Sequence, residues 1–311
     1  MMTKSKIEAI ENALAQRDLP ALDRLARPTY RTRNKKSDFR SALMLSAHNL
    51  RHLLKIESLE ADCVMINLED GVSKQEKPFA LALTAIFLSE LRECEKKLVV
   101  RVNALNEGGF DEITYLNQFH PDAIRVPKIR TPDEVKAVLA LLDEETELHL
   151  SIETKGAWDN LNHLAIDKRV TTYYLGILDL FADMRLPQSL ITPDNPTMQY
   201  MLSHFLITTK AISVKPVSFV YQDFKNMDAF YVWLELEKRM GFTAKGCISP
   251  SQVTAVHEIF VDEVAELERA HVIVKLFEMN REMGITGFVD EEYGFIDEPI
   301  YKGALALLDK K

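Results

Sequence analysis

Charged side chains follow directly after several short apolar runs of this chain. Glu153 and Asp179 each come just after such a run. Two carboxylates that leave coordination positions open suit a hard divalent ion that keeps water ligands, which describes Mg²⁺ better than Zn²⁺. Asp183 is a second candidate ligand, because it shares a face with Asp179 if that segment is helical. The acids therefore predict a magnesium site, and an ion pair of Glu153 with Lys128 or Lys155 is the structural alternative.

Arg101 lies inside the apolar run VVRVN at 99–103. Burying a guanidinium is costly unless it meets an anion, and the planar group matches a carboxylate with two parallel hydrogen bonds. We therefore expect Arg101 either to bind a substrate carboxylate or to pair with Glu69 or Asp70, which end an earlier run. Both interpretations hold together if those acids orient the arginine toward a substrate.

These residues need a scaffold that brings the ends of strands together. Short apolar runs begin near residues 41, 63, 98, 123, 147, 172, 216 and 245. Continuous apolar runs are typical of parallel strands covered by helices on both faces, and most of the spacings suit strand-helix units of about 30 residues. Eight such units predict a TIM (β/α)₈ barrel, with its chemistry at the carboxyl ends of the strands. An open doubly wound sheet is the alternative, but no G-x-G-x-x-G follows the first run.

The 311 residues fit one barrel with appendages. Residues 1–36 predict an N-terminal helical extension, an amphipathic helix followed by a basic connector. Residues 37–255 predict the barrel. Residues 256–311 predict a C-terminal helix followed by a lid or oligomerisation segment, in which a hairpin-like stretch precedes a last helix.

Composition excludes several classes of partner and location. The formal net charge of −9 disfavours nucleic acid and anionic membrane surfaces. The three cysteines show no C-x-x-C spacing, so we expect neither a disulfide framework nor a thiolate zinc site. The N-terminus has no apolar signal region, and no apolar run reaches the roughly 18 residues of a membrane span. We expect a cytoplasmic protein.

The same elements resemble the citrate lyase beta-subunit family, which also contains malyl-CoA and citramalyl-CoA lyases and is related to the 2-oxo-acid aldolases. The resemblance covers about residues 40–310. The motifs that carry it are RSALML at 40–45, INLEDGVSKQEK at 66–77, VVRVN at 99–103, VPK at 126–128, SIETKGA at 151–157, LGILDLFADM at 175–184, GFTAKGCISPSQV at 241–253 and GFVDEEYGFIDEP at 287–299.

The resemblance implies that Glu153 and Asp179 hold Mg²⁺ and that Arg101 binds the substrate carboxylate. Glu69 and Asp70 of the LED motif would support the arginine and the metal-bound waters.

Substrate binding would also involve Lys128 of the VPK motif and Arg40 at the first strand, whose region binds coenzyme A in relatives. The family's terminal segment closes over a neighbouring subunit's site as a lid, where Asp297, or else Asp290, would supply an acidic group. The resemblance further implies a homo-oligomer, a trimer or hexamer.

The implied activity is a Mg²⁺-dependent carbon–carbon lyase. It would act on a 3-hydroxy diacid thioester such as malyl-, citramalyl- or citryl-CoA and release a 2-oxo acid. The chain departs from the family at several positions: Ser46 and Ala47 replace a Pro-Gly turn, Ser249 replaces a histidine, and Ser218 stands where aspartate is common. Two alternatives follow: an aldolase that acts on a free hydroxy-oxo acid without coenzyme A, or a non-catalytic subunit that binds a metal or an oxo acid.

Overall fold

The computed structural model of the chain describes residues 2–28, 30–35, 38–261 and 264–308. Two compact units make up the chain, Met1–Phe260 and Val261–Lys311. The first unit contains all eight strands of the large sheet and the helices around them, and the second contains a small hairpin between two helices. Every residue predicted to take part in chemistry lies in the first unit, except Asp290 and Asp297.

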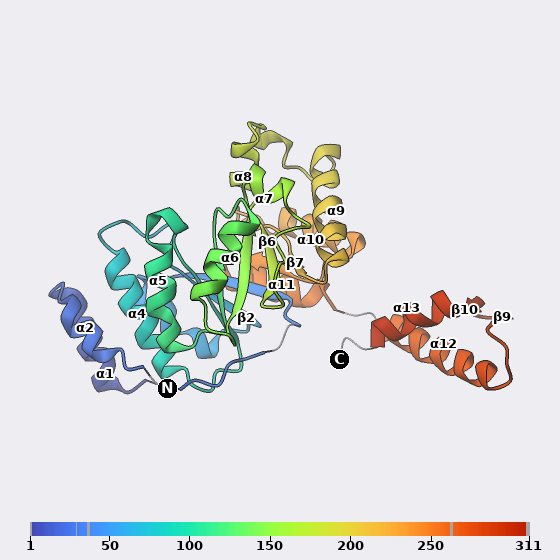
Figure 1. The fold of residues 1–311 in the computed structure, drawn as a ribbon, viewed down its shortest axis with the longest axis horizontal. Coiled ribbons are helices and arrows are strands. Elements are labelled where there is room, and N and C mark those ends of the chain that lie inside the picture. The colour runs from blue at the N-terminus through green and yellow to red at the C-terminus, as the bar shows by residue number, and fades with distance from the viewer. Residues whose placement is uncertain (1, 29, 36–37, 262–263, 309–311) are drawn as a thin grey trace. The chain divides into compact units, whose positions relative to one another are not determined.

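Eight strands form one parallel sheet in the first unit, in the order β7-β6-β5-β4-β3-β2-β1-β8 (Figure 1). Beyond β7, the Ser218 amide donates to the Ala244 carbonyl at 2.9 Å and the Gly246 amide to the Ser218 carbonyl at 3.1 Å, so the two edges meet. The predicted TIM barrel is therefore confirmed. The strands are β1 (Ser41–Ser46), β2 (Cys63–Asn67), β3 (Lys97–Arg101), β4 (Ala123–Val126), β5 (Glu147–Ile152), β6 (Val170–Leu175), β7 (Lys215–Val217) and β8 (Lys245–Cys247).

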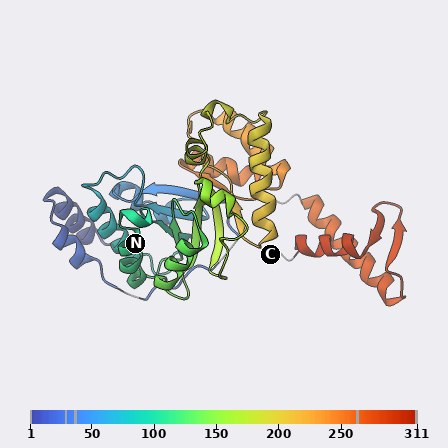
Figure 2. The same cartoon turned by 45° about the horizontal axis from the view of Figure 1, so that its top comes forward.

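Helices surround the strands, as the two views of the ribbon show (Figures 1 and 2). Several begin at residues that cap a helix well: Thr131 and Glu134 form a capping box at α6, and the Asn195 side chain accepts from two amides of α9. The helices are α3 (Leu50–Leu53), α4 (Lys77–Glu90), α5 (Gly109–Leu116), α6 (Pro132–Leu141), α7 (Lys155–Asp159), α8 (Ile177–Asp183), α9 (Pro196–Ala211), α10 (Met227–Met240) and α11 (Pro250–Ile259).

The N-terminal extension contains two helices, α1 (Lys4–Ala15) and α2 (Leu19–Leu25), where the sequence analysis expected one. The Asp18 side chain accepts from the Ala21 amide at 3.0 Å and starts α2, so it separates two short helical segments. Both helices lie beside α4 (Figure 1). Lys6 pairs with Glu90 at 2.6 Å, and the Arg17 guanidinium lies 4.0 Å from the centre of the Phe79 ring. The extension is therefore docked on the barrel.

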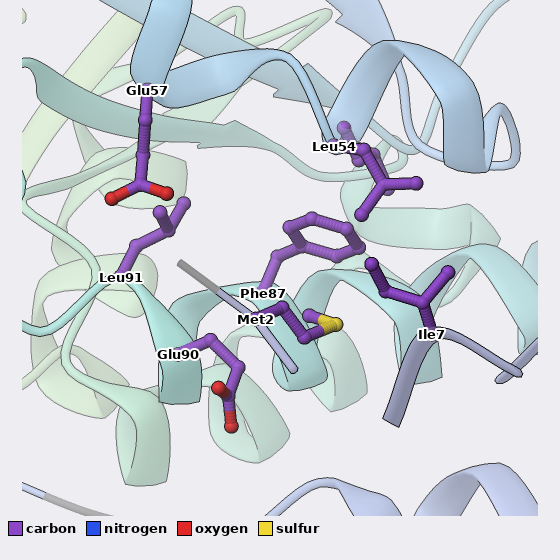
Figure 3. A pocket seen from close by; sticks show the side chains of 8 residues that line it. Met2, Ile7, Leu54, Glu57, Phe87, Glu90 and Leu91 are labelled. Atoms are coloured by element: carbon purple, nitrogen blue, oxygen red, sulfur yellow. The ribbon is translucent and has the colours of Figure 1, made fainter. Parts of the chain in front are cut away.

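A cavity of about 180 Å³ lies between the start of α1 and the helices it covers. Met2, Ile7, Leu54, Phe87 and Leu91 line it with apolar groups that point toward one another (Figure 3). The wall is completed by Leu53 and by two acids, Glu57 and Glu90. These residues come from the extension and from barrel helices, so the cavity marks a packing boundary between the extension and the barrel.

The second unit has its own apolar core, in which the Phe277 and Tyr301 rings stack with centres 4.5 Å apart. Its elements are α12 (Val264–Glu282), β9 (Gly287–Asp290), β10 (Gly294–Asp297) and α13 (Glu298–Leu308). The predicted hairpin and last helix are confirmed. The helix expected at the start of residues 256–311 is divided, because α11 ends at Ile259 and α12 begins at Val264. In the described parts of the chain, no helix is long and apolar enough to cross a membrane.

A buried ion pair supports the closure of the barrel between β7 and β8. Lys245 of β8 contacts Glu237 of α10 at 2.6 Å, and the Ser218 hydroxyl donates to the same carboxylate oxygen at 2.6 Å. The Lys245 ammonium also lies 4.1 Å from the centre of the Phe219 ring. Both charged side chains are fully buried, so each depends on the other for compensation.

Replacing one member of this pair will destabilise the barrel strongly. We expect Glu237→Ala to lower the free energy of unfolding by about 3–5 kcal/mol, because it leaves the Lys245 ammonium buried without a partner. The double variant Glu237→Leu with Lys245→Met is the control, since it removes both charges and keeps apolar volume. Urea unfolding followed by circular dichroism measures both, and a double variant as unstable as the single one would contradict this account.

Candidate active site

The guanidinium of Arg101 lies at the carboxyl edge of the barrel, where β3 ends. Its Nη2 atom forms an ion pair with Glu69 and lies 3.7 Å from Asp70 and 3.8 Å from Glu153. Arg101, Glu69 and Glu153 are all buried. The Arg101 Nε is also buried, and it has no hydrogen-bond partner among the described residues. One donor of the arginine is therefore left for an acceptor that the protein does not supply.

The loop after β2 presents Glu69 and Asp70 to this arginine. The Leu68 amide donates to the Arg101 carbonyl at 2.9 Å, and the Asn67 side-chain amide donates to the Asp70 carbonyl at 2.6 Å. Burial works to raise the pKa of Glu69, but Arg101 and Lys128 hold it below its ordinary value. Burial and the neighbouring Glu69 raise the pKa of Asp70. Of these two acids, Asp70 is therefore the one that takes up a proton more readily.

Lys128 joins the cluster from the end of β4. Its ammonium lies 3.0 Å from the carboxylate of Glu69, and that hydrogen bond raises the pKa of the lysine. Lys128 has a positive φ of 56°, a left-handed conformation that is uncommon outside glycine. In this conformation its amide donates to Glu153 at 2.8 Å. One residue thus contacts both buried acids, through its side chain and its backbone.

Glu153 follows β5 and lies against the start of α8. A Cβ atom at Gly176 would lie 2.5 Å from the Cβ and 2.7 Å from the Oε2 atom of Glu153, so only glycine leaves room for this carboxylate. The Gly176 amide donates to the Ile152 carbonyl at 3.0 Å and sets that spacing. Burial raises the pKa of Glu153, and the nearby Arg101 opposes the change.

Asp179 lies in the first turn of α8, three residues after Gly176, and is exposed. Asp183 of the same helix instead accepts from the Lys155 amide at 2.7 Å, at the start of α7. Glu153 and Asp179 are therefore the acids that could hold a cation here. No cluster of three His, Cys, Asp or Glu side chains suited to a metal occurs in the described part of the chain. Two carboxylates, one of them with space kept beside it by glycine, fit a Mg²⁺ ion that completes its coordination with water or substrate oxygens.

Arg40 lies apart from this cluster, and the two candidate acids of the second unit have partners within that unit. Arg40 precedes β1 and is therefore at the opposite end of the parallel strands, where its amide donates to Asp62 at 2.8 Å. Asp297 belongs to the second unit and accepts from the Ile300 amide at 3.2 Å. Asp290, the alternative acid, accepts from two amides of the turn between β9 and β10. The structure does not bring Arg40 together with Arg101, because the two residues lie at opposite ends of the parallel strands.

The positions that depart from the family pattern have local structural roles. The Ser249 hydroxyl accepts from the Gln252 amide at 3.3 Å and caps α11. The Ser46 hydroxyl lies 2.9 Å from the His48 ring, and the buried Ala47 donates its amide to the Asn67 carbonyl at 3.0 Å. Ser218 contacts Glu237 in the barrel wall. Each of these residues is therefore compatible with the fold in its present form.

The sequence analysis missed Arg125, which lies in β4 beside Arg101 in register. We noticed Arg101 because it is a charged residue inside an apolar run. Arg125 has the same feature, since it lies in the apolar run AIRVP at 123–127. A hollow of about 470 Å³ next to Lys128 was also not predicted. Its walls come from the segments after β3 and β4, including the first turns of α5 and α6, and contain Leu105, Phe110 and Arg130. A volume of this size suits a small organic ligand.

Comparison with known proteins gives consistent matches along the chain. A family model described as HpcH/HpaI aldolase/citrate lyase matches residues 40–250. A (3S)-malyl-CoA thioesterase of Cereibacter sphaeroides (strain ATCC 17029) is 30% identical over 241 residues, which cover 77% of this chain and 83% of that protein. The citrate lyase subunit beta of Haemophilus influenzae is 25% identical over 283 residues, which cover 87% of this chain and 96% of that protein.

Solved structures share the fold. The crystal structure of protein CitE from Mycobacterium tuberculosis in complex with magnesium, acetoacetate and coenzyme A has a TM-score of 0.68 to this chain. The alignment covers 88% of this chain and 99% of that one, at 21% identity. At this identity the likeness supports the barrel architecture alone.

Substituting Gly176 tests the packing around the Glu153 carboxylate. We expect Gly176→Ala to lower the free energy of unfolding of the barrel by about 1–3 kcal/mol, because the added methyl group overlaps Glu153 and the backbone conformation itself suits alanine. Thermal unfolding measured by circular dichroism detects the change. Gly303→Ala is the control, since nothing lies within 4 Å of its added methyl group. A barrel transition unchanged in Gly176→Ala would show that the glycine is not needed there.

Proposed function

Because this chain belongs to the HpcH/HpaI aldolase/citrate lyase family, we propose that it cleaves a carbon–carbon bond in a 3-hydroxy diacid thioester such as malyl-, citramalyl- or citryl-CoA and releases a 2-oxo acid. Family membership confirms the predicted class of enzyme, a carbon–carbon lyase of the citrate lyase beta type. The thioester, the metal and the residue roles are our proposal. The observation that carries it is the buried Arg101, whose Nε has no acceptor, at the end of the barrel where this fold places its chemistry.

Arg101 would bind the carboxylate of the 2-oxo acid. Its Nη2 is occupied by Glu69, so the carboxylate would meet the other donors of the guanidinium. The ion pair with Glu69 orients the guanidinium before substrate arrives, which reduces the entropy lost on binding. Lys128 also forms an ion pair with Glu69. Its ammonium would lie close enough to the bound oxo acid to stabilise negative charge that develops on the acid.

Glu153 and Asp179 would hold Mg²⁺. When bound there, the ion would act as a Lewis acid toward the hydroxyl and carboxylate oxygens of the substrate. The Lys128 amide fixes the orientation of Glu153 through its bond to Oε1, which leaves Oε2 on the side of Arg101. The carboxylate that accepts the hydroxyl proton, and so acts as the general base, would come from the C-terminal segment, with Asp297 as the candidate. In the family the terminal segment closes over the site of a neighbouring subunit, so we propose a homotrimer or hexamer in which Asp297 acts in this way.

Removing either proposed metal ligand will abolish metal-dependent turnover with the fold intact. We expect Glu153→Ala and Asp179→Ala to lose Mg²⁺-dependent cleavage of the thioester, measured by release of the 2-oxo acid, while circular dichroism remains that of the wild type. Asp183→Asn is the matched control on the same helix, because Asp183 contacts the Lys155 amide. Full activity in either alanine variant would refute the metal assignment.

The geometry of Arg101 matters as well as its charge. We expect Arg101→Lys to lower kcat/KM by on the order of 100-fold, because an ammonium cannot pair with Glu69 and offer a second planar donor edge at the same time. Steady-state kinetics on the thioester measures this loss. A nearly normal kcat/KM would mean that the arginine has only a structural role.

The similarity to a malyl-CoA thioesterase supports a second candidate function, hydrolysis of the thioester. Product analysis separates the two with malyl-CoA as the probe. A lyase forms acetyl-CoA and glyoxylate, whereas a thioesterase forms malate and free coenzyme A. Both reactions require binding of coenzyme A, so isothermal titration of the Mg²⁺-loaded protein with acetyl-CoA tests them together. Binding of oxaloacetate or glyoxylate without binding of acetyl-CoA would instead support the aldolase on free acids.

A further inference from the structure

Arg125 is a buried cation in the interior of the barrel that the proposed reaction does not yet use. It lies in β4, and its exposed fraction is 5%. Its Nε donates to the Ser151 hydroxyl at 2.8 Å and its Nη1 to the Met65 sulfur at 3.2 Å. The guanidinium also lies 4.2 Å from the centre of the Tyr174 ring. These contacts hold the group in one place, but none of them brings a negative charge.

Arg125 differs from the other buried cations in having no carboxylate partner. The structure describes five buried lysine and arginine residues, and four of them have a carboxylate partner within ion-pair distance. For Arg125 no carboxylate among the described residues lies within 4 Å. A buried charge without a partner costs several kcal/mol, and a residue of similar length such as methionine could fill the same space without that cost. The charge therefore calls for an explanation beyond packing.

The remaining donor of the Arg125 guanidinium is Nη2. Nη2 donates to no acceptor in the described chain, and it is not among the fully buried atoms, so it keeps some accessible surface. Burial, followed by the nearby charge of Arg101, lowers the pKa of Arg125 to about 10, so the group stays charged at neutral pH. A charged donor with accessible surface in a buried setting is suited to an anion that enters from outside.

The position of Arg125 relates it to the proposed substrate site. Arg101 and Arg125 are in register on neighbouring strands, so both side chains leave the sheet on the same face. Ser151, which fixes Arg125, is two residues before Glu153 on the same face of β5. The two arginines thus present two unsatisfied donor edges, Nε of Arg101 and Nη2 of Arg125, to the same region of the barrel.

We propose that Arg125 is a specificity-determining residue that binds a second anionic group of the substrate. This inference rests on the proposed function, in which Arg101 binds the carboxylate of a 2-oxo acid. With a second arginine beside it, the site would favour an oxo acid with two carboxylates over one with a single carboxylate. Among the thioesters considered, that selects a citryl-type substrate, which releases oxaloacetate, over malyl and citramalyl types, which release glyoxylate and pyruvate.

Binding of two oxo acids tests this proposal. The full chain in Mg²⁺ is titrated with oxaloacetate and with pyruvate, and the two dissociation constants are compared. We expect the wild type to bind oxaloacetate at least about 10-fold more tightly. In Arg125→Met, oxaloacetate binding weakens by about 10-fold or more while pyruvate binding stays within about threefold, so the preference disappears.

Two further variants separate recognition from structure. Arg125→Lys keeps the charge and should retain part of the preference; it also supplies the measurement if Arg125→Met fails to fold. Lys215→Met is the matched control, because Lys215 is a largely enclosed cation at the amino end of β7, 4.8 Å from the centre of the Phe39 ring, at the opposite end of the barrel. We expect this variant to bind both oxo acids as the wild type does.

The possible outcomes are distinct. The proposal is overturned if the wild type shows no preference, if Arg125→Met keeps it, or if that variant loses both oxo acids equally. Repeating the wild-type titrations in EDTA addresses the proposed function separately. Binding that does not depend on Mg²⁺ would count against the metal assignment, while the comparison between wild type and Arg125→Met would still report on the second arginine.

Discussion

The ion pair between Arg101 and Glu69 is the interaction on which the rest of the site depends. A guanidinium at the end of a buried strand is stable only if an acid compensates it, and Glu69 does so from the loop after the neighbouring strand β2. The acid uses one edge of the arginine and leaves Nε without a protein partner. Because Lys128 contacts both Glu69 and Glu153, the same pair also sets the position of the proposed metal ligand. The proposed substrate and metal sites therefore share one buried network.

The two ends of the barrel use buried charge differently. Along the wall between β7 and β8, Glu237 and Lys245 form an ion pair that supports closure. At the amino end, Lys97 and Glu147 do the same across 2.7 Å. At the carboxyl end, by contrast, donors on the arginines remain free. Ion pairs between two protein side chains compensate buried charge in the barrel wall, whereas a buried cation with a donor that has no protein acceptor is suited to a ligand.

The barrel and several residues of the candidate site could be predicted from the sequence, because each strand is a short apolar run followed directly by a polar residue. Arg101, Glu69 and Glu153 were found in that way. The rule of strand direction also shows why Arg40 lies apart, since it precedes its strand. The role of Gly176 could not be predicted, because it depends on a distance of 2.7 Å to Glu153 across two neighbouring strands. The contact of Arg125 with Met65 likewise joins residues 60 positions apart.

The most direct test of the central claim, that a metal and an oxo acid meet beside Arg101, is electron paramagnetic resonance with Mn²⁺ in place of Mg²⁺. The account predicts one bound Mn²⁺ per chain, with a spectrum that changes when oxaloacetate is added, because oxygen atoms of the acid replace water on the ion. Absence of bound Mn²⁺, or a bound-ion spectrum that oxaloacetate leaves unchanged, would contradict it.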